Sequence, residues 1–428
     1  MTNKTDRAIA VSVLTDVLDS GAYANIALRK TLAEANIDPR ARAFVTDLVN
    51  ETLRNLIQID FAINKFSKTP VDKMKPFIRN LLRISVCQIK FMDKIPDRAA
   101  VNEAVVLTKA FGFANLSGFV NAVLRNITRE NADKIKSPAL KYSYPKWLLE
   151  KLNMWLGETD AQNFCENSHQ PPPLIIVANT YKTTTENLLQ TLANEEIDGE
   201  PLPGLGPDGA HSPFIILRQA GDITRLTSFK EGLFSVMDPG AMLAVDAIDP
   251  QPGQTIIDLC AAPGGKSFAT AARMQNQGQV LSYDIYPHRI ELINQTRKRL
   301  GLSIVTPQVK DATAFDPTLE ASADAVLLDA PCSGFGTIRK HPEIKYNRSP
   351  KDIADLAATQ KVMLDTAARY VKPGGKLVYC TCTVTKEEND DNVKYFLENH
   401  PNYTLTEAKQ ILPSSTSDAF YIAAFVRG

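Results

Sequence analysis

Apolar residues recur at helical spacing through roughly the first 130 positions of the chain. In "ARAFVTDLVNETLRNLIQIDFAINKF" they repeat every three to five residues, as in Phe44, Leu48 and Leu53. The segment "AVNEAVVLTKAFGFANLSGFVNAVLRNI" shows the same spacing of apolar residues. This spacing places them near one face of a helix, as in helices that bury one side in a core. Strand-like alternation is nearly absent, so we predict an α-helical bundle domain over residues 1–140.

Prolines and short apolar runs mark a second region, residues 141–236. The run "HQPPPL" biases the chain toward extended structure. The strand-like segments "LIIVANT", "PFIILRQ" and "GLFSVM" follow it, and "TTENLLQTLANEE" has a helical pattern. "PLPGLGPDG" is predicted to be a loop. We therefore expect a small α/β domain here.

Strand and helix patterns alternate regularly in residues 237–428. The predicted strands are "TIIDLC", "QVLSYD", "VTPQVK", "ADAVLLD" and "KLVYCTC", separated by helical patterns such as "IELINQTRKRLG" and "DIADLAATQKVMLDTAARYV". Such alternation predicts a parallel sheet with crossover helices. "DAFYIAAFVRG" adds a terminal strand. Sheets of this class bind ligands at the C-terminal ends of their strands.

The loop "DLCAAPGGKS", residues 258–267, lies where the first strand of this sheet turns into a helix. Its small residues let the backbone approach a ligand. The glycine spacing matches neither the dinucleotide fingerprint nor the phosphate-binding loop of nucleoside triphosphatases. A tight turn without a ligand is the alternative interpretation of this loop alone.

Three aspartates end or follow later strands of the same sheet. Asp284 ends "VLSYD", where a carboxylate can accept hydrogen bonds from both hydroxyls of a ribose, and Asp311 is placed to meet an adenine amino group. With Asp329, they suit a nucleoside that lacks phosphates and carries a positive sulfonium, which indicates S-adenosylmethionine. A single aspartate at a strand end is more often a helix cap, so the prediction depends on the whole set.

Cysteines follow two strands that we expect to be neighbours. Cys332 lies in "DAPCSG", and alternation in "YCTCTV" places Cys380 and Cys382 on one face, with Cys382 nearer the ligand-binding end. The alternatives are half of a zinc site, which the singly scattered histidines disfavour, and small buried apolar side chains.

Thiols beside a methyl donor suit the methylation of carbon 5 of cytosine. That carbon is too electron-poor to attack a methyl group until a thiolate adds to position 6 of the ring. A carboxyl group at the N3 edge would stabilise the developing charge, and a base must later remove the proton from position 5. This chemistry alone leaves open which of the thiols attacks.

Charge and composition narrow the class of partner. The chain has 48 basic and 48 acidic residues, but residues 1–140 carry 21 basic against 14 acidic, so the other residues carry 27 against 34. The basic first region favours a polyanion. The polar start "MTNKTDRAIA", the absence of long apolar runs and six cysteines predict a cytoplasmic protein with reduced thiols, no membrane association and no metal.

The three motifs "DLCAAPGGKS", "LLDAPCSGFGTIRKHPEIKY" and "YCTCTVTKEEN" together resemble the RNA 5-methylcytosine methyltransferases of the RsmB/Sun/Fmu family, within the wider NOL/NOP/Sun family. "ARAFVTDLVNETLRN" and "VNEAVVLTKAFGFANLSGFVNAVLRNI" are similar to the NusB-type RNA-binding domain of this subgroup. The resemblance implies a multidomain α and α/β protein. Its parts are a NusB-like helical bundle (1–140), a small α/β domain resembling an RNA-recognition motif (141–236) and a Rossmann-like class I methyltransferase domain (237–428).

The resemblance also implies roles for residues at matching positions. Cys382 of the "TC" motif would be the nucleophile, Cys332 of the "PC" motif would assist product release, and Asp329 would face both cofactor and cytosine. The cofactor pocket would comprise Cys260, Ala261, Ala262, Pro263, Gly264, Gly265, Lys266, Asp284, Asp311 and Asp329. Contacts to the substrate RNA would come from Lys266, Pro331, Arg339 and Lys340.

Some positions depart from the family pattern. "VMDPGAMLA" keeps Asp238 but changes its neighbours, and Cys380 and Thr383 stand where serines are common.

We expect a monomeric enzyme that uses S-adenosylmethionine to methylate carbon 5 of a cytosine in small-subunit (16S) ribosomal RNA. The alternatives are a transfer RNA substrate, a non-catalytic RNA-binding ribosome assembly factor, and an amino-group methyltransferase, which needs no cysteine nucleophile.

Overall fold

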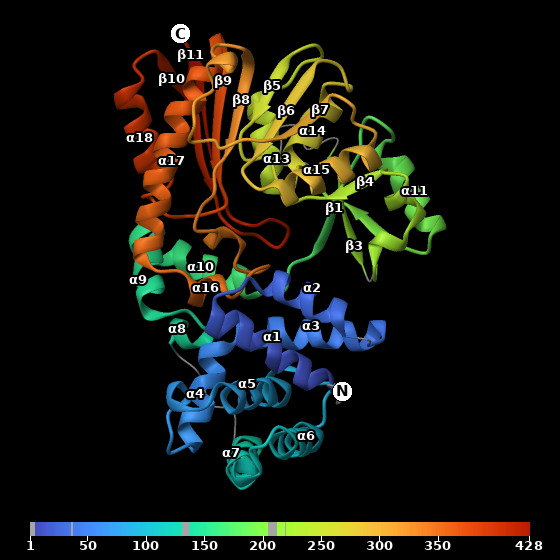
Figure 1. The fold of residues 1–428 in the computed structure, drawn as a ribbon, viewed down its shortest axis with the longest axis vertical. Coiled ribbons are helices and arrows are strands. Elements are labelled where there is room, and N and C mark those ends of the chain that lie inside the picture. The colour runs from blue at the N-terminus through green and yellow to red at the C-terminus, as the bar shows by residue number, and fades with distance from the viewer. Residues whose placement is uncertain (1–4, 36, 131–136, 204–211, 219) are drawn as a thin grey trace. The chain divides into compact units, whose positions relative to one another are not determined.

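Two compact units make up the chain in the computed structural model, which describes residues 5–35, 37–130, 137–203, 212–218 and 220–428 (Figure 1). One unit comprises residues 1–170 together with Ile338–Arg348, and the other comprises Pro171–Thr337 together with Ser349–Gly428. A short segment next to the "PC" motif therefore belongs to the first unit. The predicted domain boundaries at residues 140 and 236 stay predictions.

The first unit is helical, as predicted for its N-terminal part. Helix α3 begins at Pro39 because the side chain of Asp38 accepts a hydrogen bond from the Ala41 amide at 2.9 Å. Leu14, Leu48 and Leu82 belong to its buried core. Its helices are α1 (Asp6–Ser20), α2 (Ala24–Glu34), α3 (Pro39–Arg54), α4 (Leu56–Phe66), α5 (Pro76–Phe91), α6 (Asp97–Ala110), α7 (Ser117–Arg129), α8 (Pro138–Lys141), α9 (Lys146–Leu156), α10 (Glu158–His169) and α16 (Ile344–Asn347). No helix among the described residues is both long and apolar enough to cross a membrane.

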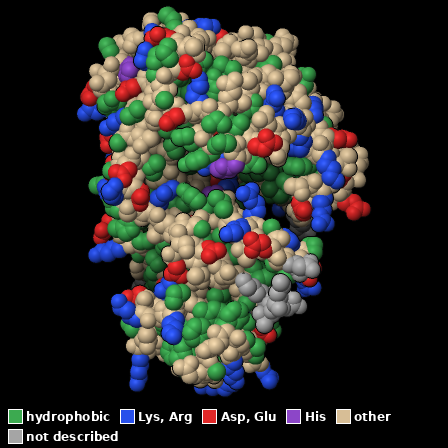
Figure 2. Space-filling view, in the orientation of Figure 1, with side chains coloured by type: hydrophobic (Ala, Val, Ile, Leu, Met, Phe, Trp, Pro, Cys, Tyr) green, Lys and Arg blue, Asp and Glu red, His purple; other side chains and the backbone are tan. Residues whose placement is uncertain are grey.

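The surface charge of the helical unit is dispersed on the face that Figure 2 shows. Lysine and arginine side chains alternate there with acidic ones, and hydrophobic side chains gather over α6 and α7. Val106 and Phe111 are exposed in this region. On this face, the excess of basic residues in the first 140 positions does not form a single patch.

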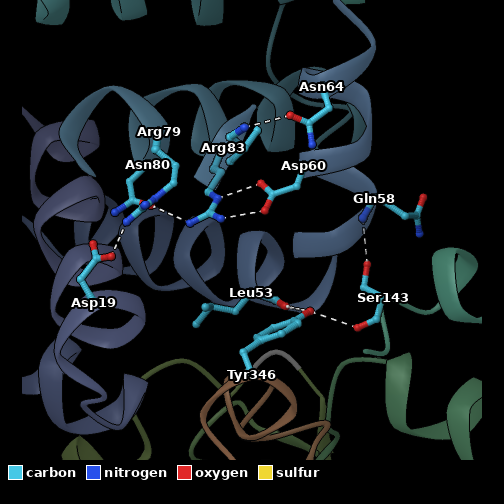
Figure 3. A network of polar contacts seen from close by, with 11 residues as sticks. Asp19, Leu53, Gln58, Asp60, Asn64, Arg79, Asn80, Arg83, Ser143 and Tyr346 are labelled. Carbon is cyan, nitrogen blue, oxygen red and sulfur yellow. Dashed lines mark hydrogen bonds and ion pairs between the residues drawn. The ribbon is translucent and has the colours of Figure 1, made fainter. Parts of the chain in front are cut away.

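The segment Ile338–Arg348 packs into the core of the helical unit through its polar side chains. The Tyr346 hydroxyl lies 3.0 Å from the Leu53 carbonyl and 3.1 Å from that of Ser143 (Figure 3). The Glu343 carboxylate accepts a hydrogen bond from the Ala24 amide, at the start of α2, at 3.0 Å. These bonds satisfy backbone groups at helix ends that would otherwise be buried without partners.

Lys345, in the same segment, has a buried amino group whose pKa is strongly lowered. Its ammonium group donates to the carbonyls of Arg54 at 3.0 Å and Tyr142 at 3.2 Å. Burial, together with the positive charge of Arg54, lowers the pKa of Lys345 to about 7. An unfolded lysine has a pKa near 10, so between these values the unfolded chain binds more protons than the folded one. The contribution of Lys345 to the free energy of unfolding therefore increases as the pH rises above about 7.

We expect this titration to distinguish wild type from Lys345→Met. Between pH 7 and 9, the free energy of unfolding of wild type should rise relative to that of the variant, by at most about 1.4 kcal/mol per pH unit. Urea unfolding at pH 7, 8 and 9 measures the difference. Lys351→Met, at an exposed lysine, is the matched control and should show no such trend. A difference between wild type and Lys345→Met that stays constant with pH would contradict the shifted pKa.

A four-stranded antiparallel sheet begins the second unit. Its strands β1 (Leu174–Ala178), β2 (Asp198–Pro201), β3 (Phe214–Arg218) and β4 (Phe234–Val236) lie in the order β2-β3-β1-β4. With α11 (Thr185–Asn194) and α12 (Thr227–Lys230), the chain order is that of a ferredoxin-like β-α-β-β-α-β unit. This confirms the predicted small α/β domain, although β2 was not predicted. The predicted loop "PLPGLGPDG" lies mostly outside the described residues.

A seven-stranded sheet forms the centre of the second unit, in the order β10-β11-β9-β8-β5-β6-β7. The five strands from β9 to β7 are parallel, while β11 runs antiparallel to both of its neighbours. The strands are β5 (Thr255–Asp258), β6 (Gln279–Asp284), β7 (Val305–Val309), β8 (Ala323–Asp329), β9 (Val371–Thr381), β10 (Tyr403–Ile411) and β11 (Phe420–Arg427).

Helices cover both faces of this sheet (Figure 1). One core contains residues of α17 (Pro350–Tyr370) and α18 (Asp390–Asn399), and a second contains residues of α13 (Pro239–Ile248), α14 (Gly265–Arg273) and α15 (Pro287–Leu300). The strand order reverses between β5 and β8, and ligands of doubly wound sheets bind in the crevice at such a point. The predicted Rossmann-like sheet with crossover helices is confirmed.

Candidate active site

The loop between β5 and α14 lies at this crevice. Gly264 has a φ of 106°, and a side chain there would meet the Phe268 ring at 2.5 Å, so the turn requires glycine. The buried Asp258 carboxylate accepts a hydrogen bond from the Ser267 hydroxyl at 2.6 Å. Burial raises the pKa of Asp258 to about 7, against the opposing effect of that hydrogen bond. Asp258 therefore stabilises the loop from beneath, and Leu259, Cys260 and Ala262 line the cleft above it.

The three predicted aspartates line one cleft of about 390 Å³ at the C-terminal ends of the strands. Asp284 ends β6, is buried, and accepts from the Tyr286 amide at 3.0 Å. Asp311 follows β7, and one of its carboxylate oxygens accepts from the Thr313 amide at 2.8 Å. Asp329 ends β8. The parallel strands thus bring together residues that lie up to 45 positions apart in the sequence.

Lys266 and Asp329 form an ion pair at the cleft. The ammonium nitrogen lies 2.5 Å from Oδ2 of Asp329 and 5.2 Å from the centre of the Phe420 ring. Burial alone would lower the pKa of Lys266, but the charge of Asp329 and the hydrogen bond to it outweigh burial, so the pKa is raised. Lys266 is therefore a permanent cation at neutral pH that fixes the orientation of the Asp329 carboxylate.

The two thiols singled out from the sequence lie side by side. Asp329 on β8 is paired in register with Cys380 on β9, so Cys332 and Cys382 follow paired positions by three and two residues. Their sulfur atoms are 3.2 Å apart, and both residues line the cleft. Cys380 is buried in the core beneath, with its sulfur 3.5 Å from Oδ1 of Asp329.

Cys332 is held in its protonated form. The hydrogen bond with Cys382 raises its pKa most, followed by burial and by the negative charges of Cys382, Glu388 and Asp329. A thiol that keeps its proton next to a second sulfur atom is a hydrogen-bond donor to that sulfur. Cys332 can therefore donate to the Cys382 sulfur atom when Cys382 is a thiolate.

Sequence reasoning missed several residues of the cleft. Ile285, Tyr286, Arg289, Lys310 and Met363 also line it. Only their positions at or shortly after the ends of the predicted strands could have indicated the first four, and Met363 comes from the middle of α17. The buried carboxylate Glu388, within the motif "YCTCTVTKEEN", was likewise not singled out.

The predicted RNA contacts fall into different environments. Pro331 is exposed at the cleft, and Lys340 is exposed. Arg339 is buried in the helical unit, where its guanidinium group donates to the Asn167 carbonyl at 3.2 Å. Lys266 is bound to Asp329, and of these two residues Asp329 is the one that lines the cleft. These RNA contacts stay predictions, and the burial of Arg339 favours a structural role for it.

Asp238 is a structural residue in this fold. Its carboxylate caps α13 by accepting from the Gly240 amide at 3.0 Å, and it also accepts from the Asp418 amide at 3.1 Å. The residues between Val236 and Ala244 therefore anchor the segment before β11 to the start of α13. The departure of "VMDPGAMLA" from the family pattern leaves this anchor intact.

The strand order, the acidic strand ends and the cleft define a Rossmann-like methyltransferase. The chain matches the family model described as 16S rRNA methyltransferase RsmB/F over residues 245–426, with the NusB family model matching residues 4–129 and the RsmF/B-like ferredoxin-like domain residues 144–222.

Full-length relatives extend this similarity over the whole chain. The probable ribosomal RNA small subunit methyltransferase B of Bacillus subtilis is 37% identical over 93% of this chain and 89% of its own, and that of Synechocystis sp. is 33% identical over 93% and 90%. The solved structure of PH0851 is 26% identical, with a TM-score of 0.82 over 99% of both chains. The chain belongs to the RsmB/F methyltransferase family.

The family uses S-adenosylmethionine, which confirms the predicted cofactor. The residues present fit a nucleoside without phosphates, because the two basic side chains that line the cleft are paired with acids. Arg289 lies 3.7 Å from Asp284, and Lys310 is bound to Asp316. Asp284 and Asp311 both line the cleft, and their roles at the ribose and the adenine end stay predictions. The cofactor supplies an activated methyl group when bound.

Removal of the Asp284 carboxylate should weaken cofactor binding without affecting the thiols. We expect Asp284→Ala to raise the Kd for S-adenosylmethionine about 10- to 100-fold, the range for losing hydrogen bonds to a charged group. Isothermal titration calorimetry measures the Kd directly. Glu291→Ala, at an exposed position on α15, is the control and should bind like wild type. An unchanged Kd for Asp284→Ala would remove Asp284 from the cofactor site.

Proposed function

We propose that this enzyme methylates carbon 5 of a cytosine in small-subunit ribosomal RNA, with Cys382 as the attacking nucleophile. The observation that carries the proposal is the pair of sulfur atoms 3.2 Å apart in the cofactor cleft, next to the Lys266–Asp329 ion pair. Relatives named for ribosomal RNA small subunit methylation support the choice of substrate.

The first step needs a nucleophile and a charged group at the ring edge. The Cys382 thiolate adds to carbon 6 of the cytosine, and the electron pair of the 5,6 double bond moves into the ring. We place the Asp329 carboxylate at the N3 edge, where it orients the Lys266 ammonium 2.5 Å away, and the positive charge of Lys266 stabilises the negative charge that develops on the ring. Carbon 5 thereby becomes the nucleophile that accepts the methyl group.

The last step releases the product from the protein. A base removes the proton from carbon 5, the 5,6 double bond forms again, and Cys382 leaves carbon 6 as a thiolate. The protonated Cys332 lies 3.2 Å from that sulfur atom and can donate a hydrogen bond to the departing thiolate. In this proposal Cys382 attacks the ring and Cys332 assists release. The target cytosine must be unpaired or flipped out for the thiol to reach its ring.

The test is methylation of purified RNA followed by base analysis. Wild type is incubated with unmodified small-subunit ribosomal RNA and methyl-labelled S-adenosylmethionine, and the RNA is digested to nucleosides. Label in 5-methylcytosine supports the proposal, and label in another nucleoside overturns the choice of carbon 5. If label appears only in a parallel reaction with transfer RNA, the substrate is transfer RNA and not ribosomal RNA. The expectations of a monomer, of no metal and of a cytoplasmic location stay predictions.

A further inference from the structure

A buried hydrogen-bond network joins the two loops that carry the thiols. Ser333 directly follows Cys332, and Thr383 directly follows Cys382. Their hydroxyl oxygens are 2.7 Å apart, and both residues are completely buried. This bond is a direct link between the "PC" and "TC" loops, immediately next to the pair of sulfur atoms.

Glu388 is the centre of the network. Its carboxylate accepts from the Ser333 amide at 2.8 Å, from the Ser333 hydroxyl at 2.5 Å and from the Thr385 hydroxyl at 2.7 Å. The residue has no exposed surface. A buried carboxylate is costly unless hydrogen bonds compensate it, and these donors come from both thiol loops. The carboxylate therefore binds the two loops to one another.

The network is anchored to a long helix. Gln360 of α17 donates through Nε2 to the Pro331 carbonyl at 2.9 Å and to Glu388 at 3.0 Å. Its Oε1 accepts from the hydroxyl of Tyr379 on β9 at 3.1 Å and from Asn392 of α18 at 2.8 Å. Because these groups sit on regular elements, the network gives the two loops a fixed reference in the scaffold.

We propose that Glu388 and the Ser333–Thr383 bond are positioning elements that hold the Cys332 and Cys382 sulfur atoms together. The role is positional, because Glu388 acts through Ser333 and Thr385 and does not line the cleft. The catalytic consequence of this inference rests on the proposed function, whereas the positioning of the two sulfur atoms does not depend on it. The negative charge of Glu388 also contributes to keeping Cys332 protonated.

The first test removes the loop-to-loop bond with an isosteric change. Thr383→Val loses the hydroxyl, whereas Thr383→Ser keeps it and is the matched control. We expect Thr383→Val to lower kcat for RNA methylation about 10- to 100-fold, the cost of a thiol displaced by a fraction of an ångström to one ångström. The Kd for S-adenosylmethionine should be unchanged, and Thr383→Ser should remain near wild type.

The second test measures the separation of the thiols without RNA. Dibromobimane becomes fluorescent when it bridges two close thiols, and peptide mass spectrometry locates the bridge. We expect rapid Cys332–Cys382 bridging in wild type and in Thr383→Ser, and bridging at least about fivefold slower in Thr383→Val and Glu388→Ala, because the loops move apart. Glu398→Ala, at an exposed carboxylate of α18, is the control and should bridge like wild type.

The two tests separate failure of the inference from failure of the proposed function. Slower bridging in the variants without 5-methylcytosine formation by wild type would keep the positioning role and reject the reaction. Methylation by wild type with equal bridging and equal kcat in Thr383→Val would overturn the positioning role. If Glu388→Ala does not fold, as judged by circular dichroism and cofactor binding, the isosteric Thr383→Val decides alone.

Discussion

Cys382→Ala should lower the rate of methyl transfer to RNA by at least about 10⁴-fold, because the covalent route depends on the sulfur that adds to carbon 6. Without this attack, carbon 5 of cytosine remains too electron-poor to accept the methyl group. Cofactor binding should persist, since the aspartates that line the cleft come from other strands. Single-turnover transfer of labelled methyl groups and calorimetric cofactor binding together measure both effects.

The matched control is the removal of a thiol elsewhere in the chain. Cys87→Ala deletes a buried sulfur in the helical unit, where it lies within the hydrophobic core. This variant should transfer methyl groups at nearly the wild-type rate. Normal turnover by Cys382→Ala would exclude Cys382 as the nucleophile and would transfer that role to Cys332.

Cys332→Ala should produce a stable covalent complex between protein and RNA. The variant retains the Cys382 nucleophile and should still transfer the methyl group once. It lacks the thiol that donates a hydrogen bond to the departing sulfur, so release should slow by about 10- to 100-fold, corresponding to the loss of a hydrogen bond to a charged group. Denaturing gels with labelled RNA should show a protein band that carries the label.

The double variant assigns the covalent bond to its sulfur atom. Cys332→Ala combined with Cys382→Ala should give no labelled protein band, because the attacking sulfur is absent. A band that persists in the double variant would mean that another residue bonds to the RNA. Release of methylated RNA from Cys332→Ala at the wild-type rate would show that Cys332 does not assist elimination.

The central parallel strands of the large sheet could be predicted because they are buried on both faces. Segments such as "ADAVLLD" read as continuous apolar runs, and β8 is found over Ala323–Asp329 as predicted. Two edge strands that were not predicted, β10 and β2, lack that signal. β10 leaves most of its residues at least partly exposed, and β2 contains Gly199 and Pro201, so neither shows a clear pattern of burial.

The site could be predicted as far as strand ends determine it. Asp284, Asp311 and Asp329 meet because parallel strands end at one edge of the sheet. The alternation of strand and helix patterns along the sequence is enough to predict that parallel arrangement. The sequence could not show that Lys266 pairs with Asp329 or that Glu388 reaches Ser333, because these contacts join residues 63 and 55 positions apart through side-chain geometry. Nor did the basic run around Lys345 indicate burial, since most such runs are solvated.

The inclusion of Ile338–Arg348 in the helical unit has a consequence for dissecting the protein. A fragment that starts at Pro171 would retain this segment but lose the residues with which it packs, among them Leu53 and Ser143. It would expose Ile344 and Tyr346 to solvent, and newly exposed apolar side chains promote aggregation. A separately expressed methyltransferase fragment should therefore have residues 338–348 replaced by a short polar linker. The same topology means that no single cut of the polypeptide separates the two units intact.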